Sequence, residues 1–390
     1  MTPTPQPLPQ ADPEVPEGRG QGPEGQGQGP KKATLVLSTR GDILAAIPYL
    51  LHFHPVDSMV VIGFAGSVLA LATRWDLPGA FAELMPTLLR EKVTNVVLVG
   101  YGHASLVTPA MEQVLQTMEA FKVTVLEALR AEDGRYWSYL CGKPGCCPPG
   151  GVPYDDMAGP VATEAVVNGL VAFPDREALA KTVEPCTGPD RTAMTVATAA
   201  TAAGLRTRLA SFRPAATIEG AKGDALVHTL VTEGIARVHA AIDLYAEGGR
   251  LDDPDASRLG FDLAMIRVRD EAWACVDDRP AHIELWKDLT RRLEPHHAAP
   301  AASLLAAAAW HAGDCTLAGL ALDRALSADP DYSMAHLLGT AVRQLVSPRS
   351  LRERMPDPAE LDAQMGPPKA SWLVPLLDLL QPPAAAQAAG

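Results

Sequence analysis

The sequence predicts an α/β fold followed by an all-helical part, and three observations lead to this expectation. The chain has 390 residues, more than one domain usually holds, and 47% of them are hydrophobic, which is enough to bury two cores. Short β-rich runs and helical segments share the first half of the chain. From about Asp224 onward, the apolar side chains instead recur every three or four residues, as they do in helices. We expect a mixed sheet with β-hairpins in the first part, for which α+β is the alternative description.

The two ends of the chain differ from the rest in composition. Residues 1–32 consist largely of Pro, Gly and Gln with almost no aliphatic side chains, so we expect a disordered tail. Residues 348–390 form a Pro- and Ala-rich tail in which Ser371–Leu380 can dock one short helix.

The first expected unit is a strand, a loop and a helix. Thr34–Leu37 is a short apolar run, a polar turn follows it, and Asp42 can cap a helix that runs to Leu51. Pro48 should end or bend this helix, because its ring lacks a hydrogen-bond donor and clashes with the preceding turn.

Two hairpins and a helix-flanked strand complete the expected sheet. Gly66-Ser67 and Asp133-Gly134 suit tight turns with positive φ, and each separates two β-rich runs. The runs are Ser58–Phe64 with Val68–Trp75, and Val123–Arg130 with Arg135–Leu140. A buried strand at Asn95–Val99 lies between the hairpins, and the expected helices are Pro109–Ala120, Ala158–Leu170 and Arg176–Thr182.

The second part is expected to be a helical bundle. A boundary near Arg213 to Gly223 assigns residues 33–215 to the α/β part and 224–347 to the helical part. Ser303–Pro330 resembles a tetratricopeptide unit, with two helices joined at Gly313-Asp314. Because one such unit cannot build an array, we expect these helices to pack as one compact bundle.

Charge and missing signatures exclude several classes of protein. The chain carries 33 basic and 46 acidic residues, a formal charge of −13, which does not favour binding to nucleic acid. It has neither a signal peptide nor a transmembrane run, so we expect a cytoplasmic protein with no membrane partner. Six cysteines are too few for a disulfide scaffold. The motifs GxxxxGKS/T, HExxH and GxSxG are missing, which makes common nucleotide hydrolases, zinc proteases and α/β-hydrolases improbable.

Several ordered motifs together resemble an actinobacterial family known as domain of unknown function 4192. In the first part they are Pro48-Tyr49-Leu50-Leu51-His52-Phe53-His54-Pro55 with Asp57-Ser58, Thr73-Arg74-Trp75-Asp76-Leu77-Pro78, Gly134-Arg135-Tyr136-Trp137-Ser138, and Cys141 with Cys146-Cys147-Pro148. In the second part they are Ala309-Trp310, Gly313, Arg324-Ala325-Leu326 and Asp329-Pro330. Position 52 is more often glycine in that family. The resemblance spans about Thr34 to Pro348 and supports the architecture, but it implies no reaction.

The densest candidate site is the group Cys141, Cys146 and Cys147, whose thiolates could bind zinc. The spacing opposes this interpretation, because adjacent Cys146 and Cys147 should point in different directions. A fourth ligand would have to come from Cys186 or His103. The alternatives are a redox pair and ordinary thiols, and the latter is favoured.

A second candidate is the turn Gly100-Tyr101-Gly102-His103-Ala104-Ser105, which follows a strand and precedes a helix, as a phosphate-binding turn does. Ser105 stands where a third glycine would complete the dinucleotide motif. Glu127 is placed where a ribose-binding carboxylate would fall, on the same strand face as Val123, Val125 and Leu129. The simpler interpretation is a tight turn.

A third candidate is a polar cluster that would form if the ends of the first strands meet. Its members are Ser38, Arg40, His54, Asp57, Ser58, Arg74 and Asp76. Arg40 beside a helix N-terminus suits an anion, and His54 with Asp57 suits proton transfer. The favoured alternative is structural, with Arg74 paired to an acid such as Asp76. The pair His296-His297 is expected to be a solvated linker.

These observations favour an interaction or regulatory protein without catalytic activity, whose helical part binds a protein or peptide partner. The alternative is a protein that binds a small molecule, such as an anion or a nucleotide, or an enzyme. In either case the α/β part would hold the binding site. No cofactor is predicted, and zinc at the cysteines is the one metal considered.

Overall fold

The computed structural model describes residues 39–381 except 80, 82–83, 158, 212–220 and 345. The expected tail 1–32, the strand Thr34–Leu37 and Ser38 therefore lie outside the described residues. The first part holds a six-stranded sheet in the order β2-β1-β3-β4-β5-β6. Only β3 and β4 run parallel, so the sheet is mixed and the predicted α/β class is confirmed. The strands are β1 Ser58–Ala65, β2 Val68–Asp76, β3 Asn95–Tyr101, β4 Thr124–Glu132, β5 Arg135–Ser138 and β6 Val152–Pro153.

Both predicted hairpins are confirmed, and their turns explain why. β1 and β2 pair antiparallel, and Gly66 between them has φ +65°. β4 and β5 pair antiparallel across Asp133 and Gly134, whose φ values of +48° and +70° suit a type I′ turn. Asp and Gly tolerate this left-handed backbone better than other residues do.

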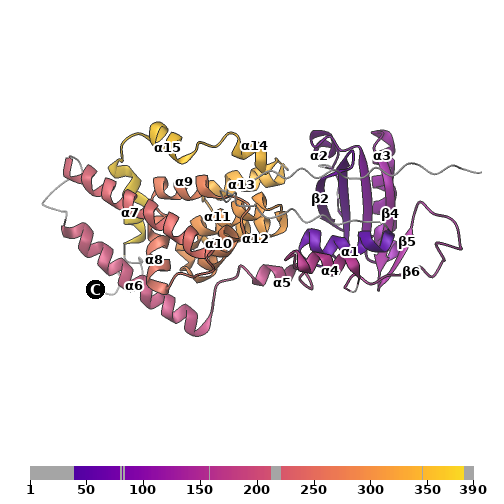
Figure 1. Ribbon diagram of the computed structural model, residues 1–390, viewed down its shortest axis with the longest axis horizontal. Helices are drawn as coiled ribbons and strands as arrows, with labels where there is room; N and C mark the ends of the chain where they lie inside the picture. The colour runs from indigo at the N-terminus through magenta and orange to yellow at the C-terminus, as the bar shows by residue number, and fades with distance from the viewer. Residues whose placement is uncertain are drawn as a thin grey trace, which may run out of the picture. The chain divides into compact units, whose positions relative to one another are not determined.

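Helices cover both faces of the sheet (Figure 1). The helices of this part are α1 Arg40–Leu51, α2 Leu84–Arg90, α3 Ala104–Ala120, α4 Pro160–Val167 and α5 Arg176–Lys181. α2 and α3 bury one apolar face of β1 and β3, whereas α1 packs on the other face and α4 packs on α1. Gly100 lets α3 approach β3 closely, because a Cβ there would lie 2.1 Å from Cγ1 of Val107.

Helices α1 and α3 differ from the sequence prediction in three details, namely the N-cap of α1, the effect of Pro48 and the start of α3. Its N-cap is Thr39, and Asp42 completes a capping box by accepting the amide N–H of Thr39. Pro48 does not end the helix, which continues to Leu51 with Pro48 buried inside it. Packing of the buried side chains of α1 against the sheet offsets the hydrogen bond that Pro48 lacks. α3 likewise begins before its expected start at Pro109, at Ala104.

The second part contains helices and no strand among its described residues. Its elements are α6 Gly188–Ser211, α7 Ala221–Ala246, α8 Asp253–Asp262, α9 Ile266–Cys275, α10 Pro280–Arg292, the 3-10 turn η1 Pro295–His297, α11 Ala298–His311, α12 Cys315–Ala328, α13 Ser333–Arg343, α14 Pro348–Arg352, α15 Pro358–Met365, the 3-10 turn η2 Ala370–Leu373 and α16 Val374–Leu379. α11 and α12 are joined at Gly313, with φ +88°, and Asp314, which caps α12. Every residue of α11 from Ala298 to Trp310 is buried, so this alanine-rich helix is surrounded by its neighbours.

Two features of this part, α6 and the pair α14 and α15, have no counterpart in the sequence prediction. α6 has no strong apolar stripe, and it packs against α8 and α10. The expected boundary near Arg213 to Gly223 lies largely outside the described residues. The C-terminal tail contains α14 and α15 in addition to the helical turn expected at Ser371–Leu380.

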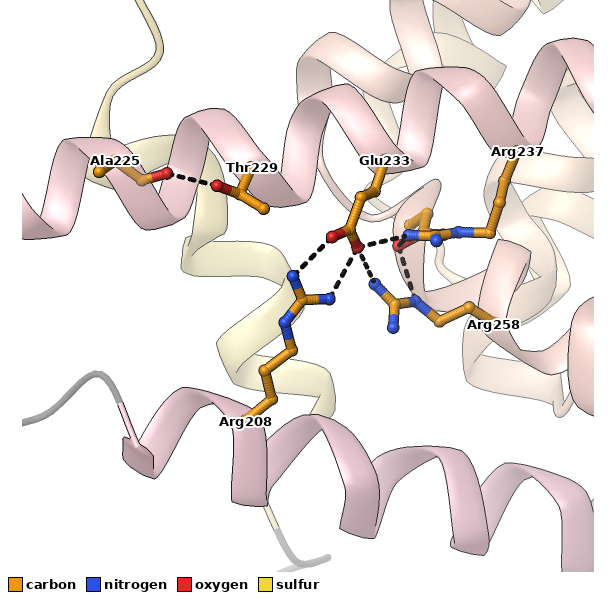
Figure 2. A network of polar contacts seen from close by, with 7 residues as sticks. Arg208, Ala225, Thr229, Glu233, Arg237 and Arg258 are labelled. Atoms are coloured by element: carbon orange, nitrogen blue, oxygen red, sulfur yellow. Dashed lines mark hydrogen bonds and ion pairs between the residues drawn. The ribbon is translucent and has the colours of Figure 1, made fainter.

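An ion-pair network joins α6, α7 and α8 (Figure 2). Glu233 accepts two hydrogen bonds from Arg208, of 2.6 and 2.7 Å, and lies 3.7 Å from Arg237 and 3.8 Å from Arg258. Arg237 and Arg258 also bind Asp262, which is 1% exposed. Buried charges such as Asp262 are tolerated only when they are paired, and this network provides the pairing while it links three helices. None of the helices in the described part of the chain is long and apolar enough to cross a membrane.

Candidate functional site

Three cysteine side chains lie together on the loop after β5, and we call residues 139–151 the thiol loop. Sγ of Cys146 lies 2.9 Å from Sγ of Cys141 and 3.7 Å from Sγ of Cys147. All three are free thiols, and their Sγ atoms lie within 4.8 Å of one another. The expectation that Cys146 and Cys147 point in different directions is wrong. Both amide N–H groups donate to the carbonyl of Lys143, so the two residues share a helical turn, where neighbouring side chains do not alternate as in a strand.

Side chains of the β4–β5 hairpin anchor the far end of the thiol loop. The indole N–H of Trp137 donates to the carbonyl of Pro149 over 2.9 Å, and Nη1 of Arg135 donates to Gly150 and Gly151 over 3.1 Å each. Arg130 stacks its guanidinium 3.7 Å from the centroid of the Trp137 ring. The loop is therefore held by contacts that do not involve its thiols.

Gly151 makes this anchoring possible. Its φ is +74°, and a Cβ there would lie 2.7 Å from the ring of Trp137. Only glycine allows both the left-handed backbone and the close approach of the ring. These anchors, Arg135 and Trp137, were part of the motif noted in the sequence, but no local pattern indicated that they hold the cysteines in place.

An ion pair lies beside the thiols. Arg40, the first residue of α1, donates from Nε to Oε1 of Glu127 over 2.8 Å and from Nη1 to Sγ of Cys147 over 3.5 Å. The hydrogen bond to Glu127 raises the pKa of Arg40 above its usual range, which keeps the guanidinium charged. Oε2 of Glu127 is buried and accepts no hydrogen bond. The structure thus brings together one residue from each of the three candidate sites: Arg40, Glu127 and Cys147.

A β-bulge explains the position of Glu127. The register of β3 and β4 shifts so that Val96 pairs with Val125 while Val97 pairs with Glu127. The expectation that Glu127 shares a face with Val125 is therefore wrong, although it does share one with Leu129. The extra residue, Leu126, is 50% exposed, and Glu127 is turned toward the face that α1 covers.

The thiols differ in acidity. Hydrogen bonds from the Cys146 thiol, from the Lys143 amide and from the Cys147 thiol, with the charge of Arg40, lower the pKa of Cys141 to about 7. The hydrogen bond of Cys147 with Cys141, together with burial, raises the pKa of Cys147 to about 11. Near neutral pH Cys141 is therefore partly ionised while Cys147 keeps its proton, an arrangement that suits metal binding or thiol chemistry.

Comparison with known proteins identifies a family for most of the chain. The family model described as Domain of unknown function (DUF4192) matches residues 41–349, which include the sheet, the thiol loop and α11–α12. The chain belongs to the DUF4192 family. No curated protein and no solved structure matches it.

The polar cluster predicted for this DUF4192 chain is only partly assembled. Ser58 pairs in the sheet with Asp76, and Arg74 binds Asp76 at 2.5 Å, as the structural alternative predicted. The carboxylate that His54 contacts is Asp156, at 3.2 Å. Arg40 is absent from this group, because Glu127 holds it.

The predicted phosphate turn is also not assembled in the DUF4192 fold. Gly100 still belongs to β3, the amide of Gly102 donates to the carbonyl of Ala131, and Ser105 lies in the first turn of α3. A Cβ on Gly102 would lie 2.7 Å from Oδ1 of Asp57, so a carboxylate borders the space that a phosphate would need. Glu127 is paired with Val97, back along the sheet from this turn.

Neither of the two extra ligands considered for zinc is near the thiols. His103 caps α3, with Nδ1 2.8 Å from Oγ of Ser105, and the amide of Cys186 donates to Arg291. A second group, His239 with Glu271 and Cys275, is close enough to hold an ion. There, however, Glu271 already binds Arg267 at 2.7 Å.

Proposed function

We propose that the protein is a cytoplasmic interaction or regulatory protein without catalytic activity of its own. One observation carries this proposal. Four large apolar side chains close together in the sequence are exposed on and beside α4: Met157 (76%), Val166 (61%), Val167 (80%) and Val171 (55%). Large apolar side chains that are exposed along one short segment, here residues 157–171, make that segment a candidate protein-binding face.

The charged groups near the sheet also support binding over catalysis. Arg40, His54 and Arg74 each have a carboxylate partner, in Glu127, Asp156 and Asp76 respectively. A general base that is already paired must lose its partner before it can take a proton, and a carboxylate beside an arginine weakens the attraction of that arginine for an anion.

The alternative, an anion- or nucleotide-binding protein, has less support. A concavity of about 300 Å³ lies beside α1, and Asp42 and Asp155 are among its lining residues. Two carboxylates oppose a negatively charged ligand there.

Native purification tests the proposal and locates the surface. The full chain is cross-linked in its own cells at its natural level and then purified, as the wild type, as the double variant Val166→Glu/Val167→Glu and as Leu337→Glu. Leu337 is 53% exposed on α13, so it is the matched control and represents the helical part.

We expect the wild type and Leu337→Glu to retain the same partner protein and the double variant to lose it. If Leu337→Glu alone loses the partner protein, the proposed function stands, but the contact lies in the helical part, as the sequence predicted. Recovery of the wild type as a bare monomer would contradict the proposal.

A further inference from the structure

We propose that Cys141, Cys146 and Cys147 together bind one thiophilic divalent cation of the zinc class, with Arg40 as a positioning residue beside it. The inference goes beyond the proposed function and does not depend on the partner-binding surface. It rests on the distances between the sulfurs, on the anchoring of the thiol loop and on the charge beside it.

The sulfur positions fit such an ion. Zinc binds cysteine sulfur at about 2.3 Å in tetrahedral geometry, so two sulfurs on one ion lie roughly 3.8 Å apart. Sγ of Cys146 is 3.7 Å from Sγ of Cys147, which matches this separation. Its 2.9 Å distance to Sγ of Cys141 requires a movement of about 0.9 Å, which a side-chain rotation supplies.

The thiol loop is fixed before any ion arrives. Trp137 and Arg135 hold its far end, and the amides of Cys146 and Cys147 are both tied to Lys143. A site that is already arranged loses less conformational entropy on binding. Because the loop is anchored, its three sulfurs can bind a metal despite the unusual pair of adjacent cysteines.

The charge balance also favours the ion. Three thiolates around a dication leave one negative charge, and Nη1 of Arg40 lies 3.5 Å from Sγ of Cys147, where it can donate to the bound thiolate. Glu127 holds the guanidinium in this orientation. Among the described residues, no fourth cysteine, histidine or carboxylate joins the group within 4.8 Å. The fourth position is therefore left to water or to a ligand from outside, as in zinc sites that exchange ligands.

The test uses the full, reduced chain, stripped of metal with a chelator. Zn²⁺ and Co²⁺ are added in turn, and native mass spectrometry and the thiolate-to-cobalt absorption are recorded. We expect one ion per chain, no binding by Cys146→Ser, and unchanged binding by Cys186→Ser, whose thiol lies outside both groups of possible metal ligands. Arg40→Gln should weaken the affinity by roughly tenfold, the usual effect of removing a residue that supports a metal ligand.

A measurement on the wild type guards against a variant that fails to fold. Zn²⁺ should protect Cys141, Cys146 and Cys147 from alkylation, while the rate at Cys186 stays unchanged. Equal metal retention by the wild type and the triple variant Cys141→Ser/Cys146→Ser/Cys147→Ser would overturn the proposal. So would a Cys141–Cys146 disulfide that forms in air-saturated buffer, with oxygen as the oxidant, despite an excess of Zn²⁺.

Discussion

Nε of Arg40 on α1 donates a 2.8 Å hydrogen bond to Oε1 of Glu127 on β4, a residue 87 positions later in the chain. Both side chains are mostly covered, at 25% and 21% exposed. The pair therefore links α1 to the sheet at the point where the thiol loop lies. We expect this pair to stabilise the fold more than an ion pair in open solvent does, because water screens it less.

Replacing Glu127 tests how much this ion pair stabilises the fold. Glu127→Gln keeps the shape but removes the charge that Arg40 faces, so we expect the free energy of unfolding to fall by about 1–3 kcal/mol. Urea denaturation measures the change. The control is Glu177→Gln, which breaks the exposed Lys181–Glu177 pair and should leave the free energy of unfolding almost unchanged. Equal effects would show that the Arg40 pair contributes no more than a surface pair.

Gly151→Ala should loosen the thiol loop. The new Cβ would require a left-handed backbone and would collide with the Trp137 ring, so the ring must leave the carbonyl of Pro149. We expect faster alkylation of Cys146 than in the wild type, measured by mass spectrometry. Gly142→Ala, in open space on the same loop, is the matched control. An unchanged rate in Gly151→Ala would mean that Trp137 does not restrain the thiols.

Local sequence chemistry predicted the turns well and the site poorly. The Asp133-Gly134 turn follows from residue types that tolerate positive φ, so the pattern alone located it. The contact between Arg40 and Glu127 depends instead on a bulge at Leu126, and strict alternation along the strand placed Glu127 on the wrong face. Register shifts of one residue are set by the packing of neighbouring elements, which short-range patterns do not contain.

The helical part shows the same limit. α6 lacks a clear apolar stripe, since Ala and Thr occupy much of its length, and the sequence did not indicate it. His297 was expected in a solvated linker, but it is 2% exposed and packs edge-on against Phe261, with ring centroids 4.4 Å apart. A proline-flanked histidine pair carries no local signal for burial.

The burial of His297 predicts a loss of stability in acid. Removal from water, together with the neighbouring His296, lowers the pKa of His297 from 6.5 to about 3. The unfolded chain takes up this proton below pH 6.5, whereas the folded chain does not, so stability is complete above pH 6.5 and falls progressively down to about pH 3. Between pH 6.5 and 5 the loss should be roughly 2 kcal/mol.

Urea denaturation at pH 7 and pH 5 checks this loss. His297→Phe removes the titrating group while keeping an aromatic ring, so the difference between the two pH values should shrink. The substitution His228→Phe, at an exposed position on α7, is the control and should leave the difference unchanged. A pH dependence that is the same in His297→Phe and in the wild type would contradict the assignment.

The network in Figure 2 predicts the largest effect of a single substitution. Asp262 is 1% exposed, and it accepts hydrogen bonds from Nε of Arg237 at 2.5 Å and from Nε of Arg258 at 3.1 Å. Asp262→Asn leaves two arginines beside a neutral amide, and breaking a buried ion pair from one side costs about 3–5 kcal/mol. We expect the melting temperature of the helical part to fall sharply, as recorded by circular dichroism.

The companion variant Glu233→Gln separates burial from charge, because Glu233 binds the same arginines while its side chain remains 36% exposed. Water can solvate the arginines on that side of the network, so this variant should cost well under half as much. A double variant, Asp262→Asn with Arg237→Gln, removes one uncompensated charge as well. It should therefore be more stable than Asp262→Asn alone, because the penalty comes from a charge left without its partner. A double variant that is less stable than Asp262→Asn would show that Arg237 contributes through packing rather than through its charge.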